Sequence, residues 1–331
     1  MFDFQDNSVE DFIGFYSAEG FWVDERIDLF DEENSRRLVG IVPEISVRMD
    51  SERFSAAVCV DGLMLLRIRH LAANMPSMSN PQRFEEAVRW WEEHVDYANA
   101  LQLFIESESI KCPNSGEAVL SAVSLYETCR VGFMKGMPVR RNHSEGRSLV
   151  AARYATANWI REGRVGHPPM EAVSFGWSNW IVLSERSIIT ALDKFEKAVA
   201  DPCLVKQLSF IAKAKTAYAR NDFPVAFTLL WFVIESAAKE ILANSLGSKG
   251  ESHKRANSVF LDLKAECLIS EEQFERLDDL RRRVRNKLMH ESGSAACLPS
   301  DCVAASQAAL DLAVRDPSFG ITAKWSSGVE F

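Results

Sequence analysis

The sequence predicts an α+β fold, in which a mixed strand and helix region precedes an all-helical region. In residues 1 to about 75, short runs rich in aromatic and β-branched residues alternate with turn residues, which is typical of strands. From about residue 185, apolar residues recur every three or four positions, which is typical of amphipathic helices. A chain of 331 residues is long for one compact domain. We therefore expect two domains, at residues 1–190 and 191–331.

Several short strands are expected in the first region. The candidate strands are Phe12–Tyr16, Gly20–Val23, Leu38–Met49, Phe54–Val60 and Leu63–Ile68. Pro43 favours an edge strand or a bulge for the third, because proline cannot donate to a ladder. The last two strands flank Asp61-Gly62, a strong signal for a two-residue hairpin turn. The charged stretch Asp24–Arg37 is expected to be a solvated loop.

A long amphipathic helix is predicted to follow the strands. Asn80-Pro81 is a suitable helix start, because proline is favoured in the first turn. One helical face collects Phe84, Val88, Trp91, Val95, Ala98, Leu101 and Ile105. Residues 112–190 mix short apolar runs with glycine, proline and basic turns, such as Lys135–Pro138 and Arg140–His143. We expect more sheet there, together with helices.

The remaining chain is predicted to be helical. The expected helices are Ser187–Ala200, Leu204–Arg220, Ala226–Ser245, Val259–Cys267, a basic helix opening at Ser270, and Ser300–Val314. Asp222 is a good N-cap for the third helix, and Ser270 and Gln273 have capping-box spacing. Residues 246–258 are expected to form a mobile loop. Trp325 and Phe331 lie in a tail that is expected to dock on the protein.

Composition limits the classes of function. A formal net charge of −9 argues against nonspecific coating of nucleic acid, but it leaves room for one local basic site. The longest apolar run, Phe223–Ile234, is too short to span a bilayer. Met1–Asp6 has no basic segment typical of a signal peptide. Seven cysteines without a CxxC pair indicate free thiols in a reducing cytosol. We therefore expect a cytoplasmic protein without a metal site or cofactor.

The most informative segment, Arg281–Glu291, is basic within this acidic chain. Apolar residues of the same predicted helix form a stripe with helical spacing: Phe274, Leu277, Leu280, Val284 and Leu288. Arg282 and Arg283 follow aspartates by four residues, so exposed ion pairs explain them. Arg285 differs, because Arg281 lies at i−4. Two stacked like charges are reasonable if a phosphate binds between or beside them.

His290 ends this basic segment. Asn286 is a poor residue for a helix interior, and on a regular helix it shares a face with His290. Arg285 and His290 would point about 140° apart on such a helix. They converge only if the helix ends or bends there, and Ser292-Gly293-Ser294 favours an ending. Alternatively, His290 is a cation placed favourably at a helix C-terminus.

The predicted helix Ala226–Ser245, which comes before the basic segment in the chain, is apolar on nearly every face. Such a helix is central in a bundle or lies at an oligomer interface. Glu235 interrupts the apolar sequence. It either pairs with Lys239 at i+4, or it supplies a carboxylate that orients the basic site.

The combination of these motifs resembles the HEPN superfamily of helical domains, over about residues 200–315. The resemblance rests on Trp231-x3-Glu235 in one helix, then Arg281-x3-Arg285-Asn286-x3-His290, then a final helix. Arg89/His94 and Arg161/His167 also fit the bare Arg-x4-6-His spacing. The first pair lies inside a predicted helix beside two tryptophans, which indicates packing, and the second lies in a loop rich in glycine and proline.

The resemblance implies metal-independent RNA cleavage at a composite site built by two protomers of a prokaryotic defence or toxin system. His290 would be the general base or acid acting on the ribose 2′-hydroxyl, a role suited to a side chain that titrates near neutrality. Arg285 would hold the scissile phosphate and stabilise its developing charge. Asn286 would position either group. Substrate contacts are expected from three further residues: Arg281, Lys287 and Glu235.

Several alternatives remain open. A noncatalytic module for dimerisation or RNA binding would use the same arginines without needing His290. An enzyme with its site in residues 1–190 is a third possibility, although that region has no P-loop, GxGxxG, GxSxG or HExxH motif. Under the leading hypothesis, the first domain senses a trigger such as a phage component, restrains the nuclease or binds a regulatory protein. A toxin subgroup carries tyrosine two residues after the histidine, whereas this chain has Ser292, so silencing by nucleotidyl transfer is not expected.

Overall fold

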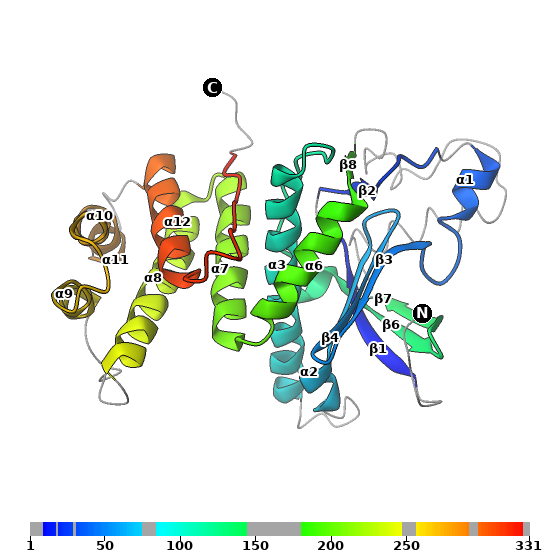
Figure 1. Ribbon diagram of the computed structural model, residues 1–331, viewed down its shortest axis with the longest axis horizontal. Helices are drawn as coiled ribbons and strands as arrows, with labels where there is room; N and C mark the ends of the chain where they lie inside the picture. The colour runs from blue at the N-terminus through cyan, green and yellow to red at the C-terminus, as the bar shows by residue number, and fades with distance from the viewer. Residues whose placement is uncertain are drawn as a thin grey trace. The chain divides into compact units, whose positions relative to one another are not determined.

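The computed structural model describes residues 9–17, 19–28, 31–74, 84–143, 180–246, 256–290 and 297–326. The chain divides into two compact units, Met1–Pro202 and Cys203–Phe331. The first unit combines an antiparallel sheet with helices and the second is helical, which confirms the α+β class (Figure 1). The predicted domain boundary at residue 190 falls inside α6 (Glu185–Ala198), a helix of the first unit.

A six-stranded antiparallel sheet in the order β3-β4-β5-β1-β6-β7 organises the first unit (Figure 1). Its strands are β1 (Glu10–Phe15), β3 (Ile45–Asp50), β4 (Phe54–Cys59), β5 (Met64–Ile68), β6 (Thr128–Met134) and β7 (Met137–His143). A separate parallel pair joins β2 (Phe21–Val23) to β8 (Ile181–Leu183). Strand β1 therefore connects two hairpins that are about sixty residues apart in the sequence.

The predicted hairpin around Asp61-Gly62 is confirmed, but its turn is longer than two residues. Strand β4 ends at Cys59 and β5 begins at Met64. The amide of Gly62 donates to the Cys59 carbonyl, and Gly62 has a φ of +77°. Such a tight turn closed by a left-handed glycine is the usual longer alternative to a two-residue hairpin. Asp61 stabilises it by accepting hydrogen bonds from the Tyr16 hydroxyl and the Leu63 amide.

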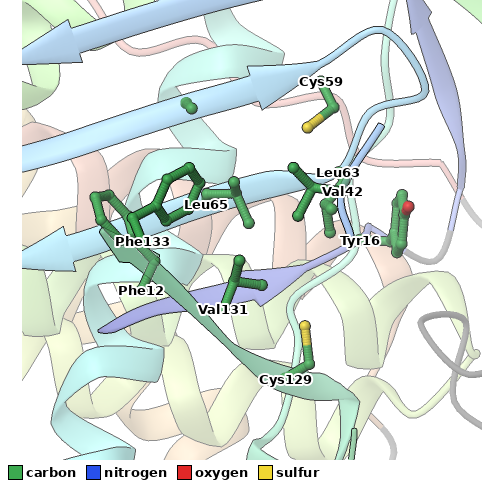
Figure 2. Close-up of a cluster of buried hydrophobic side chains, with 10 residues drawn as sticks. Phe12, Tyr16, Val42, Cys59, Leu63, Leu65, Cys129, Val131 and Phe133 are labelled. Atoms are coloured by element: carbon green, nitrogen blue, oxygen red, sulfur yellow. The ribbon is translucent and has the colours of Figure 1, made fainter. Parts of the chain in front are cut away.

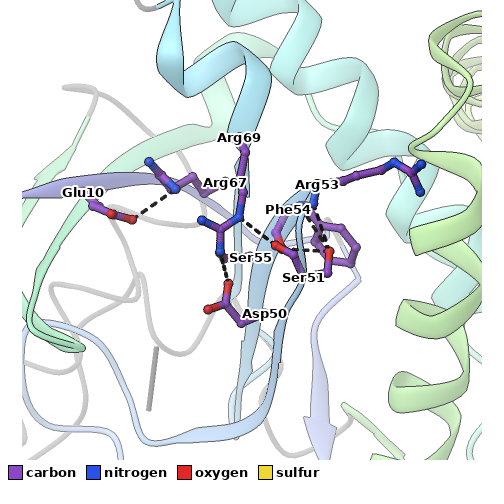
Figure 3. Close-up of polar contacts among 8 residues, drawn as sticks. All are labelled: Glu10, Asp50, Ser51, Arg53, Phe54, Ser55, Arg67 and Arg69. Atoms are coloured by element: carbon purple, nitrogen blue, oxygen red, sulfur yellow. Dashed lines mark hydrogen bonds and ion pairs between the residues drawn. The ribbon is translucent and has the colours of Figure 1, made fainter. Parts of the chain in front are cut away.

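Strand β3 lies at an edge of the sheet, as Pro43 indicated. The strand begins at Ile45, two residues after the proline, and its register with β4 shifts between Ile45 and Val47. Figure 3 shows how its far end is fixed. Arg69 donates from Nη2 to Asp50 Oδ1 at 2.6 Å and from Nε to the Ser51 carbonyl at 2.7 Å. The turn between β3 and β4 is thereby attached to the end of β5.

Both faces of the sheet are buried. One face carries a cluster that Figure 2 shows inside the curled sheet: Phe12, Tyr16, Val42, Ala57, Cys59, Leu63, Leu65, Cys129, Val131 and Phe133. The other face packs on helices α3 (Phe84–Lys111) and α6, where the Phe54 and Phe104 rings lie 5.2 and 6.2 Å from that of Phe195. Burial of large aromatic side chains on both faces contributes to the driving force for folding this unit.

Helix α3 also holds an extended segment of chain through buried polar side chains. Asn99 donates to the Val123 carbonyl at 3.1 Å and accepts from its amide at 2.8 Å. Glu106 accepts from the Leu120 amide at 2.8 Å, and Ser109 accepts from the Ala118 amide at 3.1 Å. All three helical side chains are fully buried. Spacings of seven and three residues place them along one helix face. There they form the backbone hydrogen bonds that a neighbouring strand would otherwise form with this segment.

Two details of the first region differ from the prediction. Arg140–His143 belongs to β7 and does not form a turn; the turn is Lys135-Gly136, whose φ angles are +51° and +74°. Two successive left-handed residues match the twist of a β-hairpin, so the strand resumes at Met137. The stretch Asp24–Arg37 contains a short helix, α1 (Glu32–Arg36). The predicted helix start at Asn80-Pro81 lies outside the described residues, as does most of 144–190.

The second unit is built from helices. They are α7 (Pro202–Ala219), α8 (Phe223–Leu246), α9 (Ala256–Ala265), α10 (Glu271–Leu280), the turn η5 (Arg281–Arg285), α11 (Asn286–His290) and α12 (Pro299–Ala313). Asp222 caps α8 by accepting from the Val225 amide at 3.3 Å, as predicted. Ser270 and Gln273 form the predicted capping box of α10. Most of the loop expected at residues 246–258 lies outside the described part of the chain.

Helix α8 lies against both α9 and α12, in keeping with the predicted central position. Trp231 is buried, stacks on Phe227 and meets the Phe260 ring of α9 edge-on. The tail docks on this unit, because the Trp325 ring lies 5.3 Å from that of Tyr218. Phe331 is outside the described residues. Within the described chain, no helix combines the length and apolar character needed to cross a membrane.

Candidate functional site

The basic segment contains a π-helical turn between two regular helices. The amide of Asn286 donates to the carbonyl of Arg281, five residues earlier, across η5. The apolar stripe anchors the segment on both sides of this turn, because Leu277, Leu280 and Val284 are all buried. Single π-helical turns inside α-helices are rare and occur frequently at functional sites. The sequence had predicted a helix here, but not the additional residue in its turn.

Glu235 contacts Arg285 and not its predicted helical neighbour Lys239. The Trp231 Nε1 donates to Glu235 Oε1 at 2.6 Å, and Arg285 Nη2 lies 3.7 Å from the same oxygen. The Arg285 side chain is 30% exposed and that of Glu235 is 23% exposed. The buried tryptophan thus holds the carboxylate, which lies within ion-pair distance of the Arg285 guanidinium. This is the arrangement expected if Glu235 orients the basic site.

The π-helical turn removes the expected stacking of Arg281 and Arg285, whereas a phosphate between or beside them stays a prediction. In a π-helical turn, Asn286 takes the place one turn above Arg281, so the two arginines are not stacked. Arg281 instead donates to Asp278 Oδ1 from Nε at 3.1 Å and from Nη2 at 2.7 Å. Each arginine therefore has its own carboxylate, and the like charges need no shared anion.

The predicted pairs of Arg282 and Arg283 are confirmed. Arg282 pairs with Asp278, and Arg283 Nε lies 3.2 Å from Asp279. Arg283 also pairs with Asp301 of α12 at 2.7 Å, a contact that raises the pKa of the guanidinium. The sequence analysis missed this contact. The sequence signal for it is Asp301, the third residue of α12, whose carboxylate also accepts from the Leu298 amide at 2.9 Å.

Asn286 lies beside Arg285, whereas Lys287 and His290 point to solvent. Asn286 Oδ1 accepts from Arg285 Nη1 at 3.4 Å. Lys287 and His290 are exposed, and neither has an ion pair or hydrogen bond within the described chain. The structure therefore brings together Glu235, Arg285 and Asn286. It does not bring Arg281, Lys287 or His290 into that cluster, and Ser292 lies outside the described residues.

The π-helical turn ends at Arg285, so it does not lie between Arg285 and His290. Helix α11 is regular from Asn286 to His290. Arg285 and His290 therefore point about 140° apart around its axis. The bend that would bring them together in one chain is not present up to His290. A single chain can thus offer an oriented arginine and an exposed imidazole, but on different sides of the helix.

The other histidine motifs are not competing sites in the described chain. His94 is buried, its ring packs 4.2 Å from that of Trp90, and its Nδ1 lies 3.0 Å from the Trp90 carbonyl. Burial lowers the pKa of His94 to about 4. Arg89 pairs with Glu85 on the surface, so the predicted packing role of His94 is confirmed. Arg161 and His167 lie outside the described residues.

Two further comparisons concern metals and known proteins. Among the described residues, no three histidine, cysteine, aspartate or glutamate side chains gather where they could hold a metal ion. Searches against protein families, curated proteins and solved structures return no match to this chain.

Proposed function

We propose that this protein is a metal-independent endoribonuclease of the HEPN type, acting as a homodimer in a prokaryotic antiphage or toxin-type defence system. The observation that carries the proposal is Arg285, which lies between Glu235 and Asn286 at the end of a π-helical turn. An exposed imidazole follows five residues later. Arginine suits a phosphate because its planar fork of donors matches the phosphate oxygens.

The proposed reaction is attack by a ribose 2′-hydroxyl on the adjacent phosphorus. His290 removes the hydroxyl proton as the bond from the 2′ oxygen to phosphorus forms. The bond to the 5′ oxygen breaks, and solvent water supplies a proton to that leaving oxygen. The products are a 2′,3′-cyclic phosphate and a 5′-hydroxyl. The requirement for a 2′-hydroxyl selects RNA over DNA.

Arg285 would stabilise the charge that develops on the phosphate. Its Nε is buried and has no hydrogen-bond partner in the described structure. Leaving a buried donor unpaired costs about 1–3 kcal/mol, so a ligand oxygen that reached it would recover that energy. Electrostatic stabilisation by one oriented donor contributes about 3–4 kcal/mol to the transition state. Arg281 and Lys287 would contribute longer-range attraction to the RNA backbone.

The geometry of α11 supports the proposal of a composite dimer site. Because Arg285 and His290 face different directions around the helix, one chain alone does not point both at one phosphate. In a two-fold dimer, Arg285 of one protomer can face His290 of the other. In this proposal the first unit senses a trigger, restrains the nuclease or binds a regulatory protein, and the protein acts in the cytoplasm.

The test is cleavage of RNA in excess EDTA by the wild-type protein and by His290→Ala and Arg285→Ala. We expect both variants to lose activity by about 10²–10⁴-fold. Arg282→Ala is the matched control, because this neighbouring side chain is 70% exposed and, among the residues that the structure describes, forms an ion pair with Asp278 alone. Activity that persists in His290→Ala would contradict the proposed chemistry.

A noncatalytic module would give a different pattern. His290→Ala would leave RNA binding intact, while Arg281→Ala and Arg285→Ala would weaken it and reduce its salt dependence. If the purified wild-type protein does not cleave RNA, growth after expression in bacteria separates a restrained enzyme from a binding module. Growth arrest that His290→Ala relieves supports the enzyme, and arrest that His290→Ala leaves unchanged contradicts it.

A further inference from the structure

Two thiols meet at the beginning of α12. The sulfurs of Cys297 and Cys302 lie 3.8 Å apart, and both are free. We propose that this pair is a site of reversible oxidation, at which a hydroperoxide converts the two thiols into an intramolecular disulfide. The proposal is independent of the ribonuclease activity, because neither cysteine belongs to the Arg285 cluster.

The local sequence explains why the two side chains meet. Leu298 is the N-cap of α12, so Cys297 immediately precedes the cap and Cys302 is the fourth helical residue. Side chains at these two positions pack against each other at many helix starts, an arrangement known as the hydrophobic staple. The Asp301 carboxylate accepts from the Leu298 amide and fixes the entry angle of the chain. Cysteines at both staple positions are therefore brought together by the geometry of the helix start.

The sulfurs share one backbone acceptor. Cys302 Sγ lies 3.3 Å from the Phe223 carbonyl oxygen at the start of α8, and Cys297 Sγ lies 3.6 Å from the same atom. This carbonyl holds both thiols on one side of the helix start. A disulfide requires the sulfurs to approach to about 2.05 Å, so the change needed is a movement of less than 2 Å of side chains that already touch.

The two thiols differ in exposure and in acidity. Cys302 is fully buried, and Cys297 is partly exposed. A hydrogen bond from Cys302 lowers the pKa of Cys297, and this effect outweighs burial and the Asp301 carboxylate, which both raise that pKa. The same contact and burial raise the pKa of Cys302. Because the thiolate is the reactive form, Cys297 is the thiol that an oxidant meets first, and Cys302 is the one that resolves the product.

The oxidation proceeds in two balanced steps. The Cys297 thiolate attacks one oxygen of hydrogen peroxide, the O–O bond breaks, and a sulfenic acid forms with release of hydroxide. Cys302 then gives up its thiol proton and attacks the sulfenyl sulfur, which forms the S–S bond and releases water. Overall, two thiols lose two electrons and two protons, and one peroxide becomes two waters. A dithiol reductant reverses the reaction by exchange.

The test uses the full-length protein treated with hydrogen peroxide, then denatured and alkylated. We expect the number of free thiols to fall from seven to five, and dithiothreitol to restore it. Cleavage by a protease that cuts before aspartate separates Cys297 from Cys302, since Asp301 lies between them. The two fragments should then remain linked until reduction. Two separately alkylated fragments, or a sulfinic acid without any linked product, would overturn the proposal.

Single substitutions test the order of events. In Cys302→Ser, we expect a sulfenic acid at Cys297 that a dimedone probe captures. In Cys297→Ser, we expect Cys302 to stay reduced, because it is buried. Cys203→Ser is the matched control, since Cys203 is exposed and contacts Glu240 instead of another cysteine, and the linked fragments should form as in the wild type. Labelling of Cys302 in Cys297→Ser would contradict the assigned order.

Discussion

The environment of Arg285 is set by residues from another helix more than by its neighbours in sequence. Trp231 donates to Glu235, and Glu235 and Asn286 each contact the Arg285 guanidinium. The sequence is compatible with two roles for Glu235, a helix-surface partner of Lys239 or an orienting carboxylate. Only the packing of α8 on the basic segment decides between them, and spacing along one helix cannot supply that information.

Replacing Glu235 with glutamine tests its role in positioning. The amide oxygen keeps an acceptor for Trp231, but the charge that holds Arg285 is lost. We expect kcat for RNA cleavage to fall by about 10–100-fold, with little change in KM. The melting temperature should change little, because a partly exposed pair is worth less than about 1 kcal/mol.

Glu240→Gln is the control for this change. Glu240 lies on the same helix and accepts from Gln207 at 3.1 Å, away from Arg285. It should leave kcat unaltered. An unchanged kcat in Glu235→Gln, alongside inactivity of Arg285→Ala, would show that the carboxylate does not position the arginine.

His94 provides a pH-dependent test of the first unit. An unfolded histidine has a pKa of about 6.5, whereas burial lowers the pKa of His94 to about 4. Between these values the unfolded chain binds more protons, so stability is present above pH 6.5 and is lost as the pH falls towards 4. The full loss is about 3 kcal/mol. We expect His94→Gln to lessen the fall in the free energy of urea unfolding between about pH 7.5 and pH 6 by about 0.8 kcal/mol.

If the free energy of unfolding depends on pH equally in His94→Gln and in the wild type, His94 becomes protonated in the folded protein. His290→Gln serves as the comparison, because the His290 side chain is exposed and is not among the groups that shift the pKa of His94. The difference between the two variants isolates the effect of burial from the general acid sensitivity of carboxylates.

At the scale of elements, the contact between η5 and α12 connects the π-helical turn to the rest of the second unit. Asp301 is almost fully buried and binds Arg283 at 2.7 Å, while Asp279 binds the same arginine from an exposed position. We expect Asp301→Asn to lower the free energy of unfolding by about 1–3 kcal/mol. Asp279→Asn should lower it by less than about 0.5 kcal/mol.

Chemical unfolding of both variants, followed by a tryptophan signal, measures these differences. Equal effects of the two substitutions would show that Asp301 does not anchor the turn. The comparison is matched, because both carboxylates share Arg283 as their partner and differ mainly in burial.

Elements with a strong local signal were predictable from the sequence. The strands around Asp61-Gly62, the long helix α3, the Asp222 cap and the Ser270 capping box all have short-range causes and appear near the predicted residues. The π-helical turn η5 was not predictable, because Leu277, Leu280 and Val284 have the spacing of a regular helix in the sequence. Likewise, the charged segment Arg140–His143 predicts a turn, whereas the structure pairs it with β6 as part of β7.

At the scale of the whole molecule, the proposed activity requires two chains. The role of the dimer can be tested with a heterodimer that combines one Arg285→Ala chain with one His290→Ala chain, purified through two different tags. If each site takes Arg285 from one chain and His290 from the other, one of the two sites is intact. We then expect about half of the wild-type activity.

Homodimers of each variant are the controls and should be inactive. A heterodimer as inactive as these homodimers would show that both residues must come from the same chain. The result would then contradict the composite arrangement, although the chemistry at each residue could still hold.

The side chains of α3 that hold residues 118–123 have a consequence for amide exchange. The amides of Ala118, Leu120 and Val123 are protected by a serine, a glutamate and an asparagine of a helix, and not by a neighbouring strand. Their protons therefore exchange with solvent when α3 opens, whether or not the sheet stays intact. In Asn99→Ala, the Val123 amide would exchange faster while the amides of β6 keep their wild-type rates. Equal acceleration in β6 would instead mean that helix and sheet open as one unit.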